Sequence, residues 1–144
     1  MRFSGFLSFL FTGEPFSKQE LSDVRGEIKF TEAIDAHLAW KQRLVDALTG
    51  PATHPPSAAD VGTDTACTLG QWIHDTGQQR YGDLSSFAAL RRQHAHFHDL
   101  ARQIVELARA NDLDGARRLM DGEFHQTSLD IIARIRRLSA LFGS

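Results

Sequence analysis

The sequence has little cysteine, no apolar run of membrane-spanning length and no excess of charge of one sign. Cys67 is its only cysteine, so the chain cannot form an internal disulfide. No secretory signal with a cleavage site is recognisable, and we expect a reducing, cytoplasmic environment in which this thiol stays free to bind metal. The apolar first segment, residues 3–11, is much shorter than the ~20 residues that cross a bilayer. Acidic residues are spread among the arginine pairs and the formal net charge is -2, so we expect no nucleic-acid partner.

The 144 residues suffice for one compact domain, and their apolar positions recur with the period of a helix. No stretch shows the alternation that is typical of a strand. We predict helices over residues 21–48, 67–76, 83–110 and 113–142, the second of them ended by the glycine that follows it. Residues 50–65 hold three of the four prolines and are predicted to form an irregular loop. The predicted fold is all-α, a four-helix bundle with a shorter second helix that carries the cysteine.

Residues 1–20 are predicted to form an amino-terminal apolar amphipathic extension, and residues 21–144 the bundle itself. Within the extension, apolar side chains recur on one helix face: Phe3, Phe6, Leu7, Leu10 and Phe11. Such a stripe can dock on the domain's own surface or across a dimer, contact a membrane surface, or be recognised by a partner protein. Docking on the domain's own surface or across a dimer is the simplest of these uses, and the lack of a basic polar face argues against membrane contact.

Two histidines one helical turn apart are the first indication of a metal site. His94 and His98 share a helix face, whereas His96 between them points away. Cys67 lies upstream, and a thiolate combined with imidazoles favours zinc. Taken singly, each of these side chains is better explained as an ordinary core or surface residue. Several imidazoles and a thiol in one bundle interior would nevertheless lack hydrogen-bond partners unless a metal organised them.

Three motifs, in this order, resemble the chemoreceptor zinc-binding (CZB) domain family. They are AIDAHLAW at residues 33–40, CxLGxWI at 67–73 and HxxFH at 94–98, and the resemblance extends over about residues 28–138. It implies one Zn²⁺ ion held by a histidine of the first long helix, a cysteine that opens the short helix and two histidines of the next long helix. The ligands that it implies are His37, Cys67, His94 and His98. Trp40 and Trp72 are the aromatic residues that accompany them.

Other residues near these motifs could serve as a further ligand, as hydrogen-bond acceptors for a ligand, or as points of close packing. His74 shares a helix face with the cysteine but lies ~10 Å away along the helix axis, which makes it a weaker candidate ligand. Asp35 and Asp99 are each two residues or fewer from a predicted ligand, and are either hydrogen-bond acceptors for a ligand imidazole or surface charges. Gly70 is predicted to let the short helix lie close against its neighbours.

The resemblance implies a regulatory sensor, because members of the family accompany chemotaxis receptors and diguanylate cyclases and respond to zinc or to oxidants such as hypochlorous acid. Ala95 follows His94, so the helix lacks the His-Glu-x-x-His arrangement of zinc hydrolases, and a closed four-ligand site leaves no position for a substrate. We therefore predict a zinc-binding sensor module, not an enzyme, which forms a homodimer and signals in trans to a chemoreceptor or a diguanylate cyclase. The alternatives are a zinc buffer or carrier protein and, with less support, a metallohydrolase.

Overall fold

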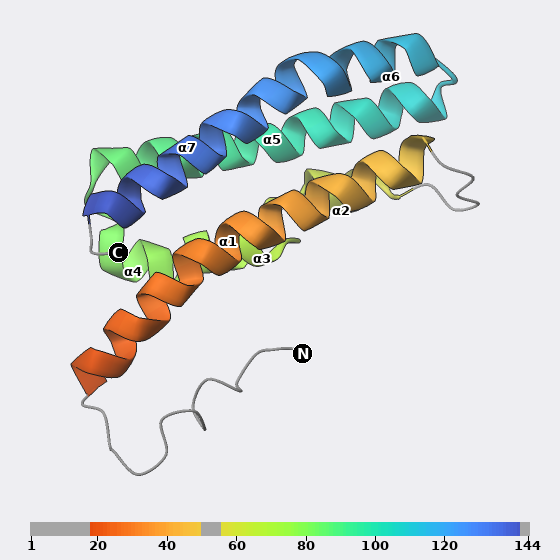
Figure 1. Ribbon diagram of the computed structural model, residues 1–144. Coiled ribbons are helices and arrows are strands. Elements are labelled where there is room, and N and C mark those ends of the chain that lie inside the picture. The colour runs from red at the N-terminus through yellow and green to blue at the C-terminus, as the bar shows by residue number, and fades with distance from the viewer. Residues whose placement is uncertain (1–17, 50–55, 142–144) are drawn as a thin grey trace.

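The computed structural model describes residues 18–49 and 56–141, which are almost entirely helical (Figure 1). The helical elements of these residues are α1 (Lys18–Thr49), α2 (Ala58–Gly62), α3 (Thr68–Trp72), the π-helical turn η2 (Ile73–Gly77), α4 (Gln78–Tyr81), α5 (Ser85–Arg109), α6 (Leu113–Leu119), the π-helical turn η3 (Met120–Phe124) and α7 (His125–Leu141). No strand occurs in the described residues, and the predicted all-α fold is confirmed.

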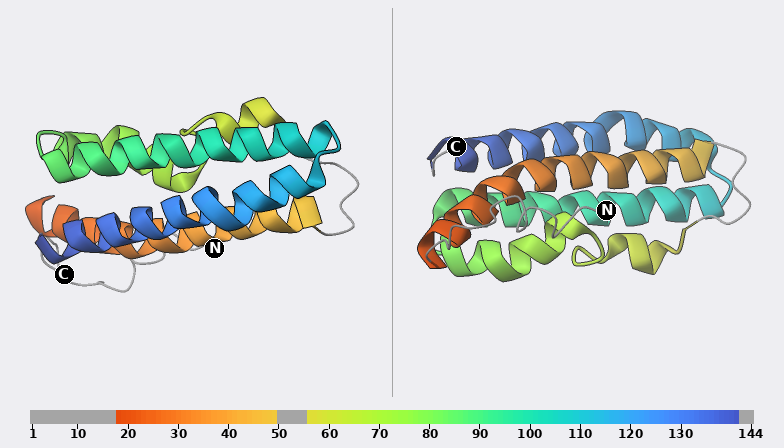
Figure 2. Two further views of the ribbon diagram at one scale, coloured as in Figure 1. Left: turned by 90° about the horizontal axis from the view of Figure 1, so that it is seen from above. Right: turned by 60° about the horizontal axis from the view of Figure 1, so that its bottom comes forward.

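The elements are arranged as four rods that lie side by side (Figure 2). α1 and α5 form one rod each, α6, η3 and α7 continue in line as a third, and the short elements from α2 to α4 make up a broken fourth rod. α5 contacts α2, α6 and α7, while α1 contacts α3 and α7. The predicted bundle, with a short helix next to the cysteine, therefore describes this arrangement well.

The bundle is held together by apolar side chains that repeat at helical spacing. On α5 the buried face includes Phe87, Leu90, Phe97 and Ile104, which follow one another at intervals of three, seven and seven residues. The largest fully buried apolar side chains are Phe87, Phe97, Phe124, Leu69, Ile73, Leu90, Leu100, Ile104, Ile131, Ile135 and Leu138. Their removal from water is the main stabilising contribution to the fold.

The turn between α5 and α6 reverses the chain within a few residues. Asn111 has a φ of 64°, a left-handed conformation that asparagine tolerates better than most residues. Asp112 then caps α6, because its side chain accepts a hydrogen bond from the backbone N–H of Gly115 at 2.9 Å. This tight turn sets α5 and α6 side by side and antiparallel.

The loop predicted over residues 50–65 contains a helix, so this part of the prediction is wrong. α2 begins after Ser57, whose side chain accepts a hydrogen bond from the backbone N–H of Asp60 at 3.4 Å. α2 packs on α5 and buries Val61. A helix of five residues is too short to show a period in the sequence, and the surrounding prolines and glycines are typical of a loop.

The prediction that the short helix ends at the glycine after residue 76 is also wrong. Gly77 has ordinary helical angles, φ −62° and ψ −45°, and the chain continues through η2 into α4. A Cβ atom at this position would lie 2.9 Å from Cε1 of Phe87 on α5. Gly77 is therefore a point of close packing between two rods instead of a helix stop.

At the amino-terminal end, α1 begins at Lys18, three residues before the predicted start of the bundle. Residues 1–17, which include the predicted apolar stripe, lie outside the described residues. The division into an extension and a bundle stays a prediction. Within the described ranges, no helix is long and apolar enough to cross a membrane.

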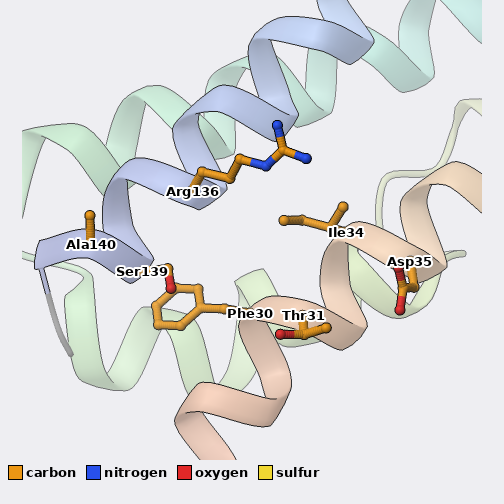
Figure 3. Close-up of a pocket in the computed structure, with 7 residues that line it drawn as sticks. All are labelled: Phe30, Thr31, Ile34, Asp35, Arg136, Ser139 and Ala140. Carbon is orange, nitrogen blue, oxygen red and sulfur yellow. The ribbon is translucent and has the colours of Figure 1, made fainter. Parts of the chain in front are cut away.

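α1 and α7 flank an open groove of about 400 Å³ (Figure 3). It is lined by Phe30, Ile34 and Asp35 of α1 and by Arg136, Ser139 and Ala140 of α7. These side chains include no histidine or cysteine, so the predicted metal ligands must lie elsewhere in the bundle.

Candidate metal centre

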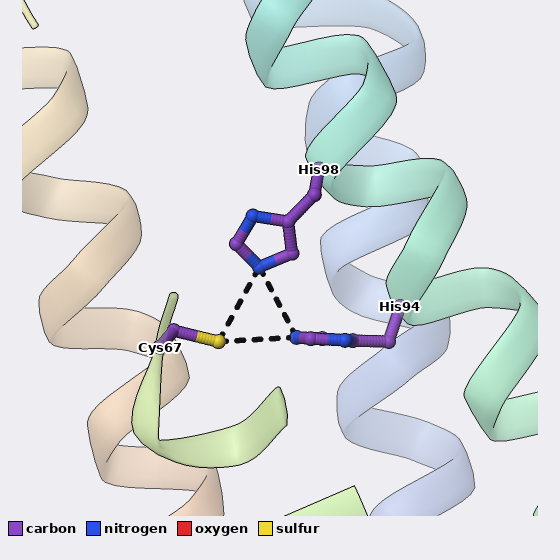
Figure 4. Close-up of side chains that lie close together, drawn as sticks. All are labelled: Cys67, His94 and His98. Carbon is purple, nitrogen blue, oxygen red and sulfur yellow. Dashed lines mark hydrogen bonds between the residues drawn. The ribbon is translucent and has the colours of Figure 1, made fainter. Parts of the chain in front are cut away.

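Cys67, His94 and His98 form a compact buried cluster (Figure 4). Sγ of Cys67 lies 3.2 Å from Nε2 of His94 and 3.3 Å from Nε2 of His98, and the two Nε2 atoms are 3.2 Å apart. Cys67 is 6% exposed and both histidines are 0% exposed. Among the described residues, this is the one group of three or more potential metal-ligating side chains whose ligand atoms all lie within 4.8 Å of one another.

The dimensions and chemistry of this triangle fit a zinc ion. Tetrahedral zinc with bonds of about 2.3 Å to sulfur and about 2.0–2.1 Å to nitrogen separates its ligand atoms by roughly 3.3–3.6 Å. The observed separations of 3.2 and 3.3 Å are slightly shorter, so small outward shifts of the side chains suffice. A sulfur and two imidazole nitrogens suit zinc and not magnesium or calcium, which prefer oxygen ligands.

Cys67 is positioned by the start of α3. It is the N-cap residue of that helix, with extended backbone angles, and its Sγ accepts a hydrogen bond from the backbone N–H of Gly70 at 3.3 Å. Burial raises the pKa of the Cys67 thiol, and the Gly70 hydrogen bond acts in the opposite direction. A bound divalent ion would displace the thiol proton, because a coordinating thiol is deprotonated by the metal charge.

His98 has a defined tautomer. Its Nδ1 donates a hydrogen bond to the backbone carbonyl oxygen of Val61 at 2.7 Å, and a carbonyl can only accept. Burial lowers the pKa of His98, so its ring is neutral and the lone pair lies on Nε2, the atom that faces the cluster. Hydrogen bonds of this kind commonly orient zinc-binding histidines. Val61 belongs to α2, so neither this acceptor nor its helix was predicted from the sequence.

His94 lacks such a hydrogen-bond partner. Its Nδ1 is buried and makes no hydrogen bond. Burial is the main cause that lowers the pKa of His94 to about 2, and the nearby histidines His98, His37 and His74 add to the effect. For Nε2 to bind a metal, the single ring proton must lie on Nδ1. An ion at Nε2, and not a hydrogen bond at Nδ1, would therefore determine the tautomer of His94.

His37, the fourth predicted ligand, lies beside the cluster and is bonded to a different residue. It is 1% exposed on α1, and its Nε2 is 2.8 Å from Oγ of Ser128 on α7. The centre of its ring is 4.6 Å from that of Phe97, the residue before His98. Burial, Lys41 and His98 lower its pKa to about 4, so the ring is neutral. The structure thus brings three of the predicted ligands together and leaves His37 on Ser128.

Comparison with protein families adds an independent observation. Residues 37–105 match the family model of the chemoreceptor zinc-binding domain. The protein contains a CZB domain. The match begins at His37 and ends within α5, so it includes every predicted ligand, although it is shorter than the predicted resemblance over about residues 28–138. No curated protein and no solved structure matches this chain.

Gly70 is a point of very close approach in the CZB domain. A Cβ atom at this position would lie 1.6 Å from the backbone carbonyl oxygen of Asp64 and 2.9 Å from Cε1 of His94. No side chain fits there unless the backbone moves. The prediction that Gly70 allows close packing is confirmed. The two residues that a side chain at this position would meet are Asp64 and His94, and His94 is a member of the cluster.

The two tryptophans of the CZB motifs have different positions. The ring centre of Trp40 is 4.6 Å from that of His98, in an edge-on contact, so Trp40 covers one side of the cluster. Trp72 is 5% exposed and packs in the core. Its aromatic neighbours, at centre distances of 5.6–6.2 Å, are Phe30, Tyr81 and Phe87. Of the two, Trp40 is the one in ring contact with a cluster residue.

The other histidines near the CZB motifs point to the surface. His74 is 3.1 Å from Oδ2 of Asp64 through its Nε2, and its side chain is 41% exposed. His96 contacts Oε2 of Glu123 at 2.7 Å, facing away from the cluster as its place between the two ligands predicted. The structure therefore places neither imidazole in the candidate site.

Of the two roles left open for Asp35 and Asp99, neither carboxylate is the acceptor for His98, whose Nδ1 donates to the carbonyl oxygen of Val61. Asp99 accepts hydrogen bonds from Arg102 at 2.7 Å and from Gln103 at 2.8 Å. Asp35 lines the groove between α1 and α7. Residues adjacent or nearly adjacent on a helix face different ways, which separates both carboxylates from the cluster.

We expect the metal-free domain to lose stability in mild acid. His37 and His94 have pKa values of about 4 and about 2 in the folded protein, below the ordinary value of 6.5. The unfolded chain takes up protons as the pH falls below about 6.5 while the buried rings stay neutral, so stability is greatest above that pH and decreases toward pH ~4. The thermal midpoint of chelator-treated protein should fall between about pH 7.5 and about pH 5, and less steeply for His94→Gln. A midpoint that stays constant over this interval would contradict the burial of neutral imidazoles.

Proposed function

We propose that this chain is a zinc-binding sensor module whose ion is held by His37, Cys67, His94 and His98. The observation that carries the proposal is the buried triangle of one sulfur and two imidazole nitrogens, which lies inside the residues matched by the CZB family model. Nothing else in the described residues gathers three potential ligands so closely. Zinc supplies no redox chemistry of its own, so its part in such a site is to hold helices together.

His37 is proposed as the fourth ligand because of its place in the bundle. It is a neutral, buried imidazole that packs on Phe97, next to His98. The competing imidazole, His74, is exposed and bonded to Asp64. Four protein ligands complete the tetrahedral shell of zinc and leave no open position for a substrate, which favours regulation over hydrolysis.

Two triggers are chemically available to such a site. The first is zinc occupancy, because the ion would connect α1, the start of α3 and α5, and its loss would loosen that connection. The second is oxidation of the Cys67 thiolate. In the net reaction the thiolate and hypochlorous acid would give a sulfenic acid and chloride: the O–Cl bond breaks, the sulfur gains the hydroxyl group and loses two electrons, and the chlorine takes them up. The sulfenic acid binds zinc less well than the thiolate.

The remaining parts of the proposal concern partners. We propose that the module works in the cytoplasm as a homodimer and acts in trans on a signalling protein, such as a chemoreceptor or a diguanylate cyclase. A zinc buffer or carrier is the alternative, and it differs in that zinc would bind without changing the helix contacts or the association state. A metallohydrolase would instead show turnover that disappears with a chelator.

The proposed function is tested by removing and restoring zinc. At a zinc concentration about 1,000-fold above Kd, binding contributes about 4 kcal/mol, so we expect the thermal midpoint to rise by roughly 10 °C. Metal analysis should find one zinc per chain, and amide hydrogen exchange of α1 should slow when zinc is restored. Stoichiometric zinc with unchanged exchange and association would favour the buffer, and the lack of any bound zinc would refute the proposal.

A further inference from the structure

A buried hydrogen bond joins α1 to α7 at the edge of the candidate metal centre. His37 Nε2 and Ser128 Oγ are 2.8 Å apart, although the residues are 91 positions apart in the sequence. Each side chain is 1% exposed. A buried polar group that loses its partner is destabilising, so each of these groups holds the other in place.

We take Nε2, the hydrogen-bonding atom of His37, as the atom with which this side chain would bind a metal. Nε2 is the part of the ring farthest from the helix backbone, and both His94 and His98 present this atom to the cluster. An imidazole nitrogen has a single bonding position in the plane of the ring, occupied by either a proton or a lone pair. Nε2 of His37 therefore cannot bind Ser128 and zinc at the same time.

We infer that His37 is exchanged between Ser128 and zinc, so that metal binding removes the buried hydrogen bond between α1 and α7. This inference rests on the proposed function, since it requires His37 to be a zinc ligand. In the arrangement that the structure shows, Nε2 is bonded to Ser128. When zinc occupies the cluster, Nε2 turns to the ion and the hydroxyl of Ser128 is released.

The surroundings of the pair allow both arrangements. The His37 ring lies against Phe97, with centres 4.6 Å apart, and Phe97 stacks on Phe124 with centres 4.4 Å apart and planes at 16°. Phe124 ends the π-helical turn η3, one helical turn before Ser128. A serine hydroxyl within a helix can bond to the backbone carbonyl four residues earlier, so the released Ser128 can turn to the carbonyl of Phe124.

The exchange would be transmitted to the contact between α1 and α7. Ile34 and Asp35, which lie within one turn of His37, line the groove between these two helices (Figure 3). Arg136 lines the opposite wall, two turns after Ser128. Loss of the hydrogen bond removes a polar link between the two walls near one end of this groove, which gives zinc occupancy an effect outside the metal centre.

The decisive test is the sign of the change in zinc affinity when the hydroxyl is removed. Because Ser128 competes for His37, Ser128→Ala should bind zinc roughly threefold to tenfold more tightly than the wild type in a chelator competition titration. The variant should also have a lower thermal midpoint than the wild type in the presence of chelator, and a nearly equal midpoint when zinc is bound. Thr127→Val removes a neighbouring buried hydroxyl on the same helix and should leave the affinity unchanged.

Three outcomes would overturn the inference. Weaker binding by Ser128→Ala would show that Ser128 supports the zinc-bound ring, with His37 binding zinc through Nδ1, and unchanged binding would show that the bond is irrelevant to the metal. In a His37→Ala background the effect of Ser128→Ala should vanish, and an effect that persists would also refute the exchange. If the wild type binds no zinc, the proposed function fails together with the inference. If the wild type binds zinc but Ser128→Ala does not tighten it, only the inference fails.

Discussion

Replacing Cys67 with alanine is expected to weaken zinc binding by more than about 100-fold, because loss of even the groups that orient a ligand typically weakens a metal site 10- to 100-fold. Cys67 supplies the single anionic ligand of the proposed set, since the pKa values of the buried histidines are lowered and their rings are neutral. Without the thiolate, the positive charge of the ion would lie among neutral side chains in a buried site. Zinc content after gel filtration and a competition titration both measure the loss.

His96→Ala is the matched control for this variant. His96 lies between the two cluster histidines on α5, its side chain is 40% exposed, and it contacts Glu123 on the surface. The His96→Ala variant should retain one zinc per chain with wild-type affinity. Since Cys67→Ala deletes only one buried sulfur atom, circular dichroism should show that the metal-free variant stays helical. Stoichiometric zinc in Cys67→Ala would exclude Cys67 as a ligand.

Gly70→Ala is expected to damage both the fold and the metal centre. The added Cβ would lie 1.6 Å from the backbone carbonyl oxygen of Asp64, and a backbone atom cannot turn away as a flexible side chain can. Insertion of extra atoms into a packed interior typically destabilises a protein by about 1–3 kcal/mol, and we expect a value at or above the upper end. Because the same Cβ would lie 2.9 Å from Cε1 of His94, zinc binding should be lost as well.

Gln71→Ala gives the control for this second variant. Gln71 is the next residue of α3 and is exposed, so the substitution changes helix propensity without changing the close contact. Denaturant unfolding of the metal-free proteins should place Gln71→Ala within about 0.5 kcal/mol of the wild type. A Gly70→Ala variant as stable as Gln71→Ala, with full zinc binding, would show that α3 can move away from Asp64 with little loss of folding stability.

The long helices were predictable because their signal is local. Helical periodicity predicted residues 21–48 and 83–110, and the structure has helices at Lys18–Thr49 and Ser85–Arg109. The errors fall where the local signal is weak or has two meanings. α2 is a single short turn among prolines and glycines, and Gly77 looks like a helix stop although its small size serves packing against Phe87.

The candidate site also has features that the local sequence predicts and features that it does not. The spacing of His94 and His98 determines that both imidazoles share a helix face, and the motif around Cys67 indicates the third member of the cluster. The sequence could not reveal the acceptor for His98, because a backbone carbonyl such as that of Val61 carries no residue-specific signature. Nor could it reveal the hydroxyl bonded to His37, since Ser128 is 91 residues away on a helix outside the matched family region.

The sequence alone therefore determined the all-α fold, the family of the domain and the residues from which a zinc site can be built. These features follow from periodicity and from short motifs, which act over a few residues along one helix. The tertiary structure decided which side chains meet: it brought Cys67 to the histidines of α5, and it bonded His37 to Ser128. Such contacts depend on the packing of whole helices against one another, and that packing is determined by the summed burial of many side chains and not by any local pattern.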